Sequence, residues 1–187
     1  MNKRRHFVEV AVPDQEKLAI LSKSTLCRGM ESADVRFIAP FFQTYHVEEK
    51  ATIYEEGDVE AFMCLIVKGE VNIMKGRDKL VSTLGEGCTV GEMAIVDNLP
   101  RSATAVAKSE ALVYTINRSS LSEIFNKSIL TWANLFFNIS VVLSHRLRIA
   151  SDLMSQCTCP IDISLAAIKF PASQFHPFTR SSATTPS

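Results

Sequence analysis

Short apolar runs separated by glycine-containing turns fill the middle of the chain. The runs FMCLIV (62–67), VNIM (71–74) and LVSTL (80–84) are each followed within two residues by a glycine, and six of the seven glycines lie between Gly57 and Gly91. Glycine supplies the positive-φ conformations that tight turns require, and partly alternating apolar positions indicate strands with one buried face. Short strands at this spacing predict an antiparallel roll or barrel, with further strands over 102–107 and 111–117.

The two ends of the chain show helical spacing instead. We expect helices over 14–25, 31–45 and 119–125, the last beginning with a capping box of Ser120 and Glu123. A long helix is expected over 130–156, where neither glycine nor proline occurs. The predicted fold class is therefore mainly β with flanking helices: an antiparallel β-roll of the jelly-roll type, with N-terminal helices and a long C-terminal helix.

The long helix carries two apolar lines, and one surface cannot cover both. The first line consists of Trp132, Leu135, Ile139, Val142, Ile149 and Leu153, and the second of Phe136, Leu143, Leu147, Ala150 and Met154. One line can pack on the roll, and the other predicts a homodimer through the 130–156 helix. The alternative is that both lines pack within one subunit. Arg146 interrupts the first line.

The length of the chain and the composition change this picture little. The 187 residues suffice for one core-bearing domain, and 47% hydrophobic residues predict a folded protein. We divide the chain into an N-terminal helical segment (1–29), a central domain that includes the long helix (30–156) and a proline-broken, irregular tail (157–187). Twenty basic and twenty acidic residues give no bulk charge that would favour nucleic acid or a membrane surface. The most apolar run, 129–143, is too short and too polar to span a bilayer.

Cysteine and histidine usage argues against metal and enzyme chemistry. The five cysteines are scattered, which is typical of reduced thiols in a cytoplasmic protein. Cys157 and Cys159 are close, but His176 is the only histidine after them, so we expect no metal site. The four histidines form no catalytic or metal-spaced cluster with other residues, so we do not expect an enzyme.

The candidate chemistry lies in VGEMAIVDNLPRSATAVA (90–107). A helical turn at GEMA would leave the amides of Gly91, Glu92, Met93 and Ala94 free to bind an anion. Arg101 offers a planar, permanently charged fork for phosphate oxygens, and the Ser102 hydroxyl can join it. A carboxylate repels phosphate, so Glu92 suits a sugar hydroxyl. The alternative is that Glu92 and Arg101 form a surface ion pair of little energetic consequence.

The same stretch resembles the phosphate-binding cassette of the cyclic nucleotide-binding domain family. The family pattern is Gly-Glu-x-Ala-hydrophobic, a few variable residues, then Arg, a small residue, Ala and Ser/Thr. The matching positions are Gly91, Glu92, Ala94, Ile95, Arg101, Ser102, Ala103 and Thr104. The resemblance extends over residues 30–156 and implies an eight-stranded β-roll. It also implies that Arg101, Ser102 and the cassette amides bind the cyclic phosphate and that Glu92 binds the ribose 2′-hydroxyl.

The long helix resembles the lid and dimer helix of the catabolite-activator branch of this family, where a Thr-Ser pair contacts the adenine. Ser151 matches that pair and Ala150 departs from it. The ligand that the resemblance implies is cyclic AMP, with cyclic GMP also possible because Ser102 is compatible with either base. Only 31 residues follow the helix, so we expect no winged-helix DNA reader and no DNA binding from this chain. The charge balance and the short apolar run 129–143 lead us to expect no membrane binding. The expected partners are the nucleotide, a second copy and an unknown downstream protein; the alternative function is a nucleotide-free interaction scaffold.

Overall fold

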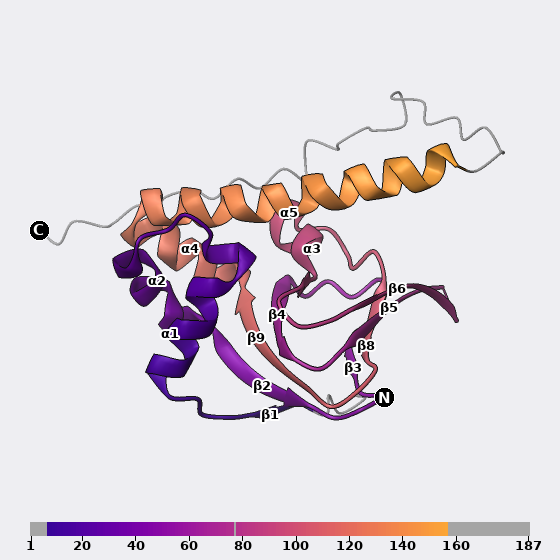
Figure 1. The fold of residues 1–187 in the computed structure, drawn as a ribbon, viewed down its shortest axis with the longest axis horizontal. Helices are drawn as coiled ribbons and strands as arrows, with labels where there is room; N and C mark the ends of the chain where they lie inside the picture. The colour runs from indigo at the N-terminus through magenta and orange to yellow at the C-terminus, as the bar shows by residue number, and fades with distance from the viewer. Residues whose placement is uncertain (1–6, 77, 157–187) are drawn as a thin grey trace, which may run out of the picture.

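The computed structural model describes residues 7–76 and 78–156, which form two β-sheets flanked by helices (Figure 1). The chain begins with β1 (Phe7–Glu9), α1 (Asp14–Lys23), the 3-10 turn η1 (Thr25–Cys27), α2 (Ser32–Ile38) and the 3-10 turn η2 (Ala39–Phe41). The strands β2 (Gln43–Val47), β3 (Thr52–Tyr54), β4 (Phe62–Lys68), β5 (Val71–Lys75), β6 (Lys79–Leu84) and β7 (Thr89–Val90) follow. The chain then continues through α3 (Glu92–Asp97), β8 (Thr104–Ala107), β9 (Ala111–Asn117), α4 (Arg118–Lys127) and α5 (Ile129–Ser155).

All strand pairs are antiparallel, and the predicted fold class is confirmed. One sheet has the order β1-β2-β9-β4-β7 and the other the order β3-β8-β5-β6. The described residues thus contain nine strands, one more than the family pattern implies. The short β1 lies within the segment 1–29 that was expected to be helical, and it pairs with β2 at the edge of its sheet.

Alternate residues of β4 belong to two separate cores, which explains why its middle is apolar without interruption. Met63 and Leu65 pack with the helices, whereas Cys64 and Ile66 point into the roll between the two sheets. Successive side chains of a strand point to opposite faces, so a strand that is buried on both faces needs an apolar residue at every position. The helical core and the roll interior therefore share one wall.

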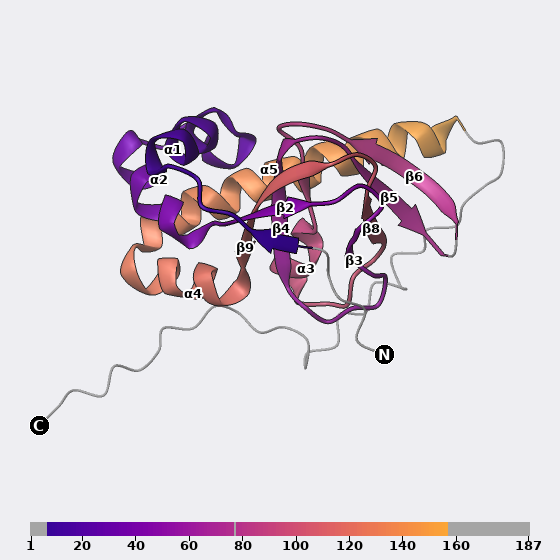
Figure 2. The ribbon, with the colours of Figure 1, turned by 90° about the horizontal axis from the view of Figure 1, so that it is seen from below.

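The helix α5 runs along the length of the molecule (Figures 1 and 2). In its first half, Leu135 and Ile139 are buried in the helical core. Asn138 fixes this half by donating to the carbonyl oxygens of Leu26 at 2.8 Å and Arg28 at 3.0 Å. Leu147, Ile149 and Leu153 in the second half are exposed. The N-terminal half of α5 is thus anchored to the N-terminal helices, and the remainder extends beyond that contact.

Two expectations about the helices are wrong. Residues 43–47 form β2 rather than the end of a helix over 31–45, because Pro40 cannot continue a helix and β2 pairs with β9 along its full length. The helix expected at 119–125 begins at Arg118, and its N-cap is Asn117, whose side chain accepts from the Ser120 amide, so the capping box is not formed.

The described residues include three of the five cysteines. Cys27, Cys64 and Cys88 are free thiols, and the first two are buried. Cys157, Cys159 and the predicted tail lie outside the described residues.

Within 7–76 and 78–156, no helix has the length and apolar character needed to cross a membrane.

Candidate functional site

Gly91 allows an unusually close approach of three segments at the start of α3. Its φ is +85°, in the left-handed region, and it links β7 to α3. A Cβ at this position would lie 2.6 Å from Nη1 of Arg101 and 2.9 Å from the carbonyl oxygen of Phe62. Any side chain would therefore displace the arginine, so glycine is required both for the backbone conformation and for the space.

The Arg101 guanidinium is buried with two of its nitrogens unpaired. Its Nη1 donates to the Gly91 carbonyl oxygen at 3.1 Å, whereas the buried Nε and Nη2 have no hydrogen-bond partner among residues 7–76 and 78–156. The ring centroids of Tyr54 and Phe62 lie 4.0 and 4.4 Å from its central carbon. Burial lowers the pKa of Arg101, but an arginine stays charged at neutral pH. A buried cation with free N–H groups is a strong candidate for an anion site.

The loop between β3 and β4 holds the backbone on both sides of this arginine. The amide of Gly57 donates to the Arg101 carbonyl oxygen at 2.9 Å, and the Arg101 amide donates to the carbonyl oxygen of Asp58 at 2.8 Å. These bonds fix the backbone from which the guanidinium projects.

Side chains add a second set of contacts to the residues that follow Arg101. Lys75 donates to the carbonyl oxygen of Ser102 at 2.6 Å and to Glu56 at 2.7 Å. The amide of Glu56 donates to Thr104 Oγ1 at 2.9 Å, and its carboxylate also accepts from the amide of Gly76. Both hydrogen bonds lower the pKa of Glu56, and the bond from Lys75 has a larger effect than the bond from Gly76. We call Glu56 and Lys75 the loop clamp.

Glu92 is also buried, and its cationic partner comes from α5. Only 2% of Glu92 is exposed, and its carboxylate accepts from Arg146 Nη1 at 3.0 Å and from the hydroxyl of Thr89. Arg146 also donates to the carbonyl oxygen of Thr89. The alternative of a surface ion pair between Glu92 and Arg101 is wrong, because both side chains are buried and no salt bridge joins them in the described part of the chain.

The remaining predicted site residues lie at different depths. Met93 is half-exposed, and the exposed Ser102 hydroxyl donates to its sulfur at 3.6 Å. Ala94 is buried and Ala103 is half-buried. Ser151 is exposed on the second half of α5, and no hydrogen bond within 7–76 and 78–156 links its side chain to the cassette. The structure therefore brings the cassette residues together and leaves Ser151 apart from them.

Sequence reasoning missed Arg146, Tyr54 and Phe62. Arg146 was visible only as a charge that interrupts an apolar line, and such a charge on a helix is a usable signal for a buried acidic partner. Tyr54 and Phe62 gave no signal, because their contacts with Arg101 arise only when β3 and β4 are placed by the roll.

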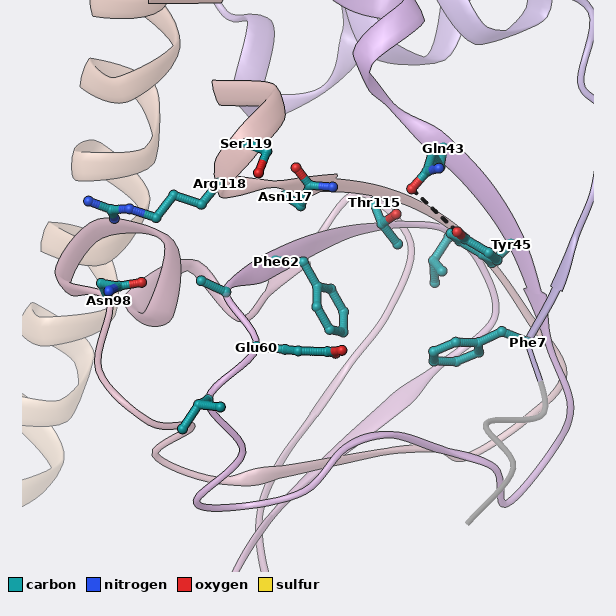
Figure 3. A pocket seen from close by; sticks show the side chains of 13 residues that line it. Phe7, Gln43, Tyr45, Glu60, Phe62, Asn98, Thr115, Asn117, Arg118 and Ser119 are labelled. Carbon is teal, nitrogen blue, oxygen red and sulfur yellow. Dashed lines mark hydrogen bonds between the residues drawn. The ribbon is translucent and has the colours of Figure 1, made fainter. Parts of the chain in front are cut away.

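A cavity of about 460 Å³ opens beside Phe62, between β1, β2 and β9 and the segment 59–62 (Figure 3). Gly91, Glu92 and Arg101 do not line it. The cassette residues and this cavity are therefore separate features, and Phe62 contacts both. Within the described residues there is no group of three or more His, Cys, Asp or Glu side chains able to hold a metal ion.

Comparison with known proteins gives consistent matches. Residues 45–128 match the family described as "Cyclic nucleotide-binding domain". A "Cyclic AMP receptor protein" from Thermus thermophilus is 27% identical over 139 residues, which is 71% of this chain and 62% of that protein. A "cGMP-dependent protein kinase" from Eimeria tenella is 31% identical over 116 residues, 62% of this chain but 12% of the kinase.

A solved structure agrees with the fold. The crystal structure of a cyclic nucleotide-binding domain from Methylobacillus flagellatus has a TM-score of 0.77 at 24% identity and covers 87% of this chain and 96% of its own. This likeness supports the arrangement of sheets and helices. The chain spans less than two thirds of the length of both curated relatives.

Proposed function

We propose that the chain is a regulatory module of the cyclic nucleotide-binding domain family, which residues 45–128 match, and that it binds a cyclic nucleotide, with cyclic AMP favoured. One observation carries the proposal: Arg101 is buried beside Gly91, and no described residue of the chain accepts a hydrogen bond from its Nε or Nη2. A cyclic phosphate supplies an anion whose oxygens can accept from both nitrogens. A protein rarely buries a cation in this way without a partner of opposite charge.

The rest of the cassette fits the same ligand. The first-turn amides of α3 have no acceptor within the helix and can donate to a phosphate oxygen. Glu92 accepts hydrogen bonds and is suited to a ribose hydroxyl, as its bond from Thr89 illustrates. Cyclic AMP is favoured over cyclic GMP because the relative matched over the longer part of this chain carries cyclic AMP in its name.

We further propose that α5 transmits the binding event. A ribose hydroxyl that reaches Glu92 must either share the Glu92 carboxylate with the guanidinium of Arg146 or displace that guanidinium. Arg146 lies on α5. Since the first half of α5 is anchored by Asn138, the change is borne by the second half, where Ser151 lies. The Nε–H resonance of Arg146 in ¹H–¹⁵N spectra is expected to move when cyclic AMP is added; an unchanged resonance at saturation would contradict this relay.

Isothermal calorimetry tests the binding proposal. We expect cyclic AMP to bind the intact protein and to bind more tightly than cyclic GMP, while Arg101→Gln loses at least about a hundredfold in affinity, the cost of a buried charge pair deprived of one member. Lys108→Met is the matched control, because Lys108 pairs with Glu70 on the exposed surface. The absence of binding to the intact, folded protein at millimolar cyclic nucleotide would favour the nucleotide-free scaffold.

A further inference from the structure

Tyr54 and Phe62 meet at Arg101 from two consecutive strands. Tyr54 is the last residue of β3 and Phe62 is the first of β4. Their ring centroids lie 6.0 Å apart with an interplanar angle of 78°, and they lie 4.0 and 4.4 Å from the guanidinium carbon of Arg101. These distances form a nearly right-angled triangle, so the guanidinium lies where two nearly perpendicular rings meet. We call Tyr54 and Phe62 the aromatic corner.

We propose that the aromatic corner orients Arg101 for an anion while its N–H groups stay available. This inference rests on the proposed function, in which Arg101 receives the phosphate. A ring attracts a cation through its face, whereas a carboxylate in the same place would accept hydrogen bonds from the guanidinium nitrogens themselves. No described residue accepts from Nε or Nη2 of Arg101, as this arrangement requires.

The aromatic corner adds no negative charge beside the arginine. Burial raises the pKa of Tyr54, so its hydroxyl stays neutral at neutral pH. Asp58 and Glu60 act on the charge of Arg101, but neither carboxylate accepts a hydrogen bond from its Nε or Nη2. The two rings therefore hold the arginine without competing with an incoming anion for those nitrogens.

The loop between β3 and β4 joins the aromatic corner to the backbone of Arg101. This loop connects Tyr54 to Phe62, and its residues Gly57 and Asp58 form the two backbone hydrogen bonds with Arg101. The backbone bonds fix where the arginine side chain begins, and the rings fix where its guanidinium lies. Without the rings, a bound anion would have to order this long side chain, at a cost of about three- to tenfold in affinity.

The order of the Arg101 side chain in the ligand-free full chain tests this positioning. Relaxation of the ¹⁵Nε–H group gives an order parameter, which we expect to be near the rigid value of about 0.85 in the unaltered protein and in Tyr54→Phe. Tyr54→Leu and Phe62→Leu should lower it below about 0.6. Phe62 is only partly buried, so Phe62→Leu keeps the test valid if Tyr54→Leu does not fold. Tyr45→Leu is the matched control, because it removes a ring that packs on Phe7 against the same core.

Calorimetry with cyclic AMP connects this order to binding. We expect both leucine variants of the aromatic corner to bind about three- to tenfold more weakly, whereas Tyr54→Phe and Tyr45→Leu bind as the unaltered protein does. An unchanged order parameter in both corner variants, or a lowered one with unchanged affinity, would overturn the proposal. Equal losses of affinity in Tyr54→Phe and Tyr54→Leu would also overturn it, because the hydroxyl rather than the ring would then be responsible. A lowered order parameter in a protein that binds no cyclic nucleotide would refute the proposed function and support the orienting role of the rings.

Discussion

At the scale of single residues, Arg101 stabilises the fold little, although its side chain is buried. Removing a guanidinium from water is costly, and within the described part of the chain only one of its nitrogens has an acceptor, the carbonyl oxygen of Gly91. Contacts with the faces of Tyr54 and Phe62 offset part of that cost, at roughly 0.5–2 kcal/mol each. This balance is typical of a residue that is kept for a ligand.

Arg101→Met is therefore expected to leave the free energy of unfolding within about 1 kcal/mol of its original value or to raise it, because the methionine needs no hydrogen-bond partner. Urea denaturation without ligand measures the change. Arg118→Met is the matched control: Arg118 donates to the Ile95 carbonyl oxygen, so its loss should destabilise by about 1 kcal/mol or more. A loss above about 3 kcal/mol in Arg101→Met would show that the arginine is structural.

The sequence allowed prediction of the cassette residues but not of their surroundings. Gly91, Glu92 and Arg101 lie within eleven positions, and the local turn and helix bring them together, so their spacing was informative. The partner of Glu92 lies 54 positions away on α5 and depends on how that helix crosses the roll. The charge of Arg146 was visible in the sequence, but nothing local identified Glu92 as its partner, and this is why the surface ion pair remained an alternative.

At the scale of elements, the loop between β3 and β4 determines where the arginine stands. Its backbone pairs with Arg101, while the loop clamp of Glu56 and Lys75 joins β5 to the carbonyl of Ser102. Hydrogen bonds thus join the cassette, the β3–β4 loop and the end of β5 into one unit. A bound anion needs donors that are held in place before it arrives, and in the proposed function these hydrogen bonds provide that support.

Lys75→Met is expected to weaken cyclic AMP binding about three- to tenfold, because the Ser102 carbonyl loses its donor and the segment after Arg101 becomes less ordered. Calorimetry measures the change, and Glu56→Gln should act in the same direction. Lys108→Met again provides the control, since its pair with Glu70 is remote from the cassette contacts. Equal affinities of Lys75→Met and the control for cyclic AMP would show that the loop clamp plays no part in binding.

The apolar runs that became β4, β5, β6, β8 and β9 were predicted as strands, whereas the end of the second helix was not predicted correctly. β9 was predicted at its observed bounds, Ala111–Asn117, as an apolar run in which nearly every residue is buried. Residues 43–45 were read as helix because Phe41 and Phe42 extend the apolar spacing of α2, although Pro40 ends that helix. The two apolar lines of α5 were also only partly informative: Trp132, Phe136 and Leu143 all pack against the core of one subunit.

At the scale of the whole molecule, an apolar line on α5 remains uncovered. It consists of Leu130, Phe137 and Val141, which are 69%, 68% and 48% exposed and recur at intervals of seven and four residues. This line differs from both predicted ones. Together with the length of α5, it supports our proposal of a homodimer in which α5 packs against its counterpart.

Phe137→Glu is expected to convert that dimer into a folded monomer, because a charge would then be buried in the helix seam. Sedimentation velocity at several concentrations measures the change. Val81→Glu, which makes the same kind of substitution at an exposed position on β6, should leave the dimer intact. A monomeric unaltered protein at high micromolar concentration would contradict the dimer.

The central claim is that the unpaired nitrogens of Arg101 receive the phosphate of a cyclic nucleotide. The Arg101 Nε–H resonance, identified by its absence from the Arg101→Gln spectrum, reports on this contact directly. We predict that cyclic AMP moves this resonance and slows its exchange with water, as expected when a charged acceptor is bound. Saturating cyclic AMP that leaves the position and exchange rate of the Arg101 resonance unchanged would contradict the claim.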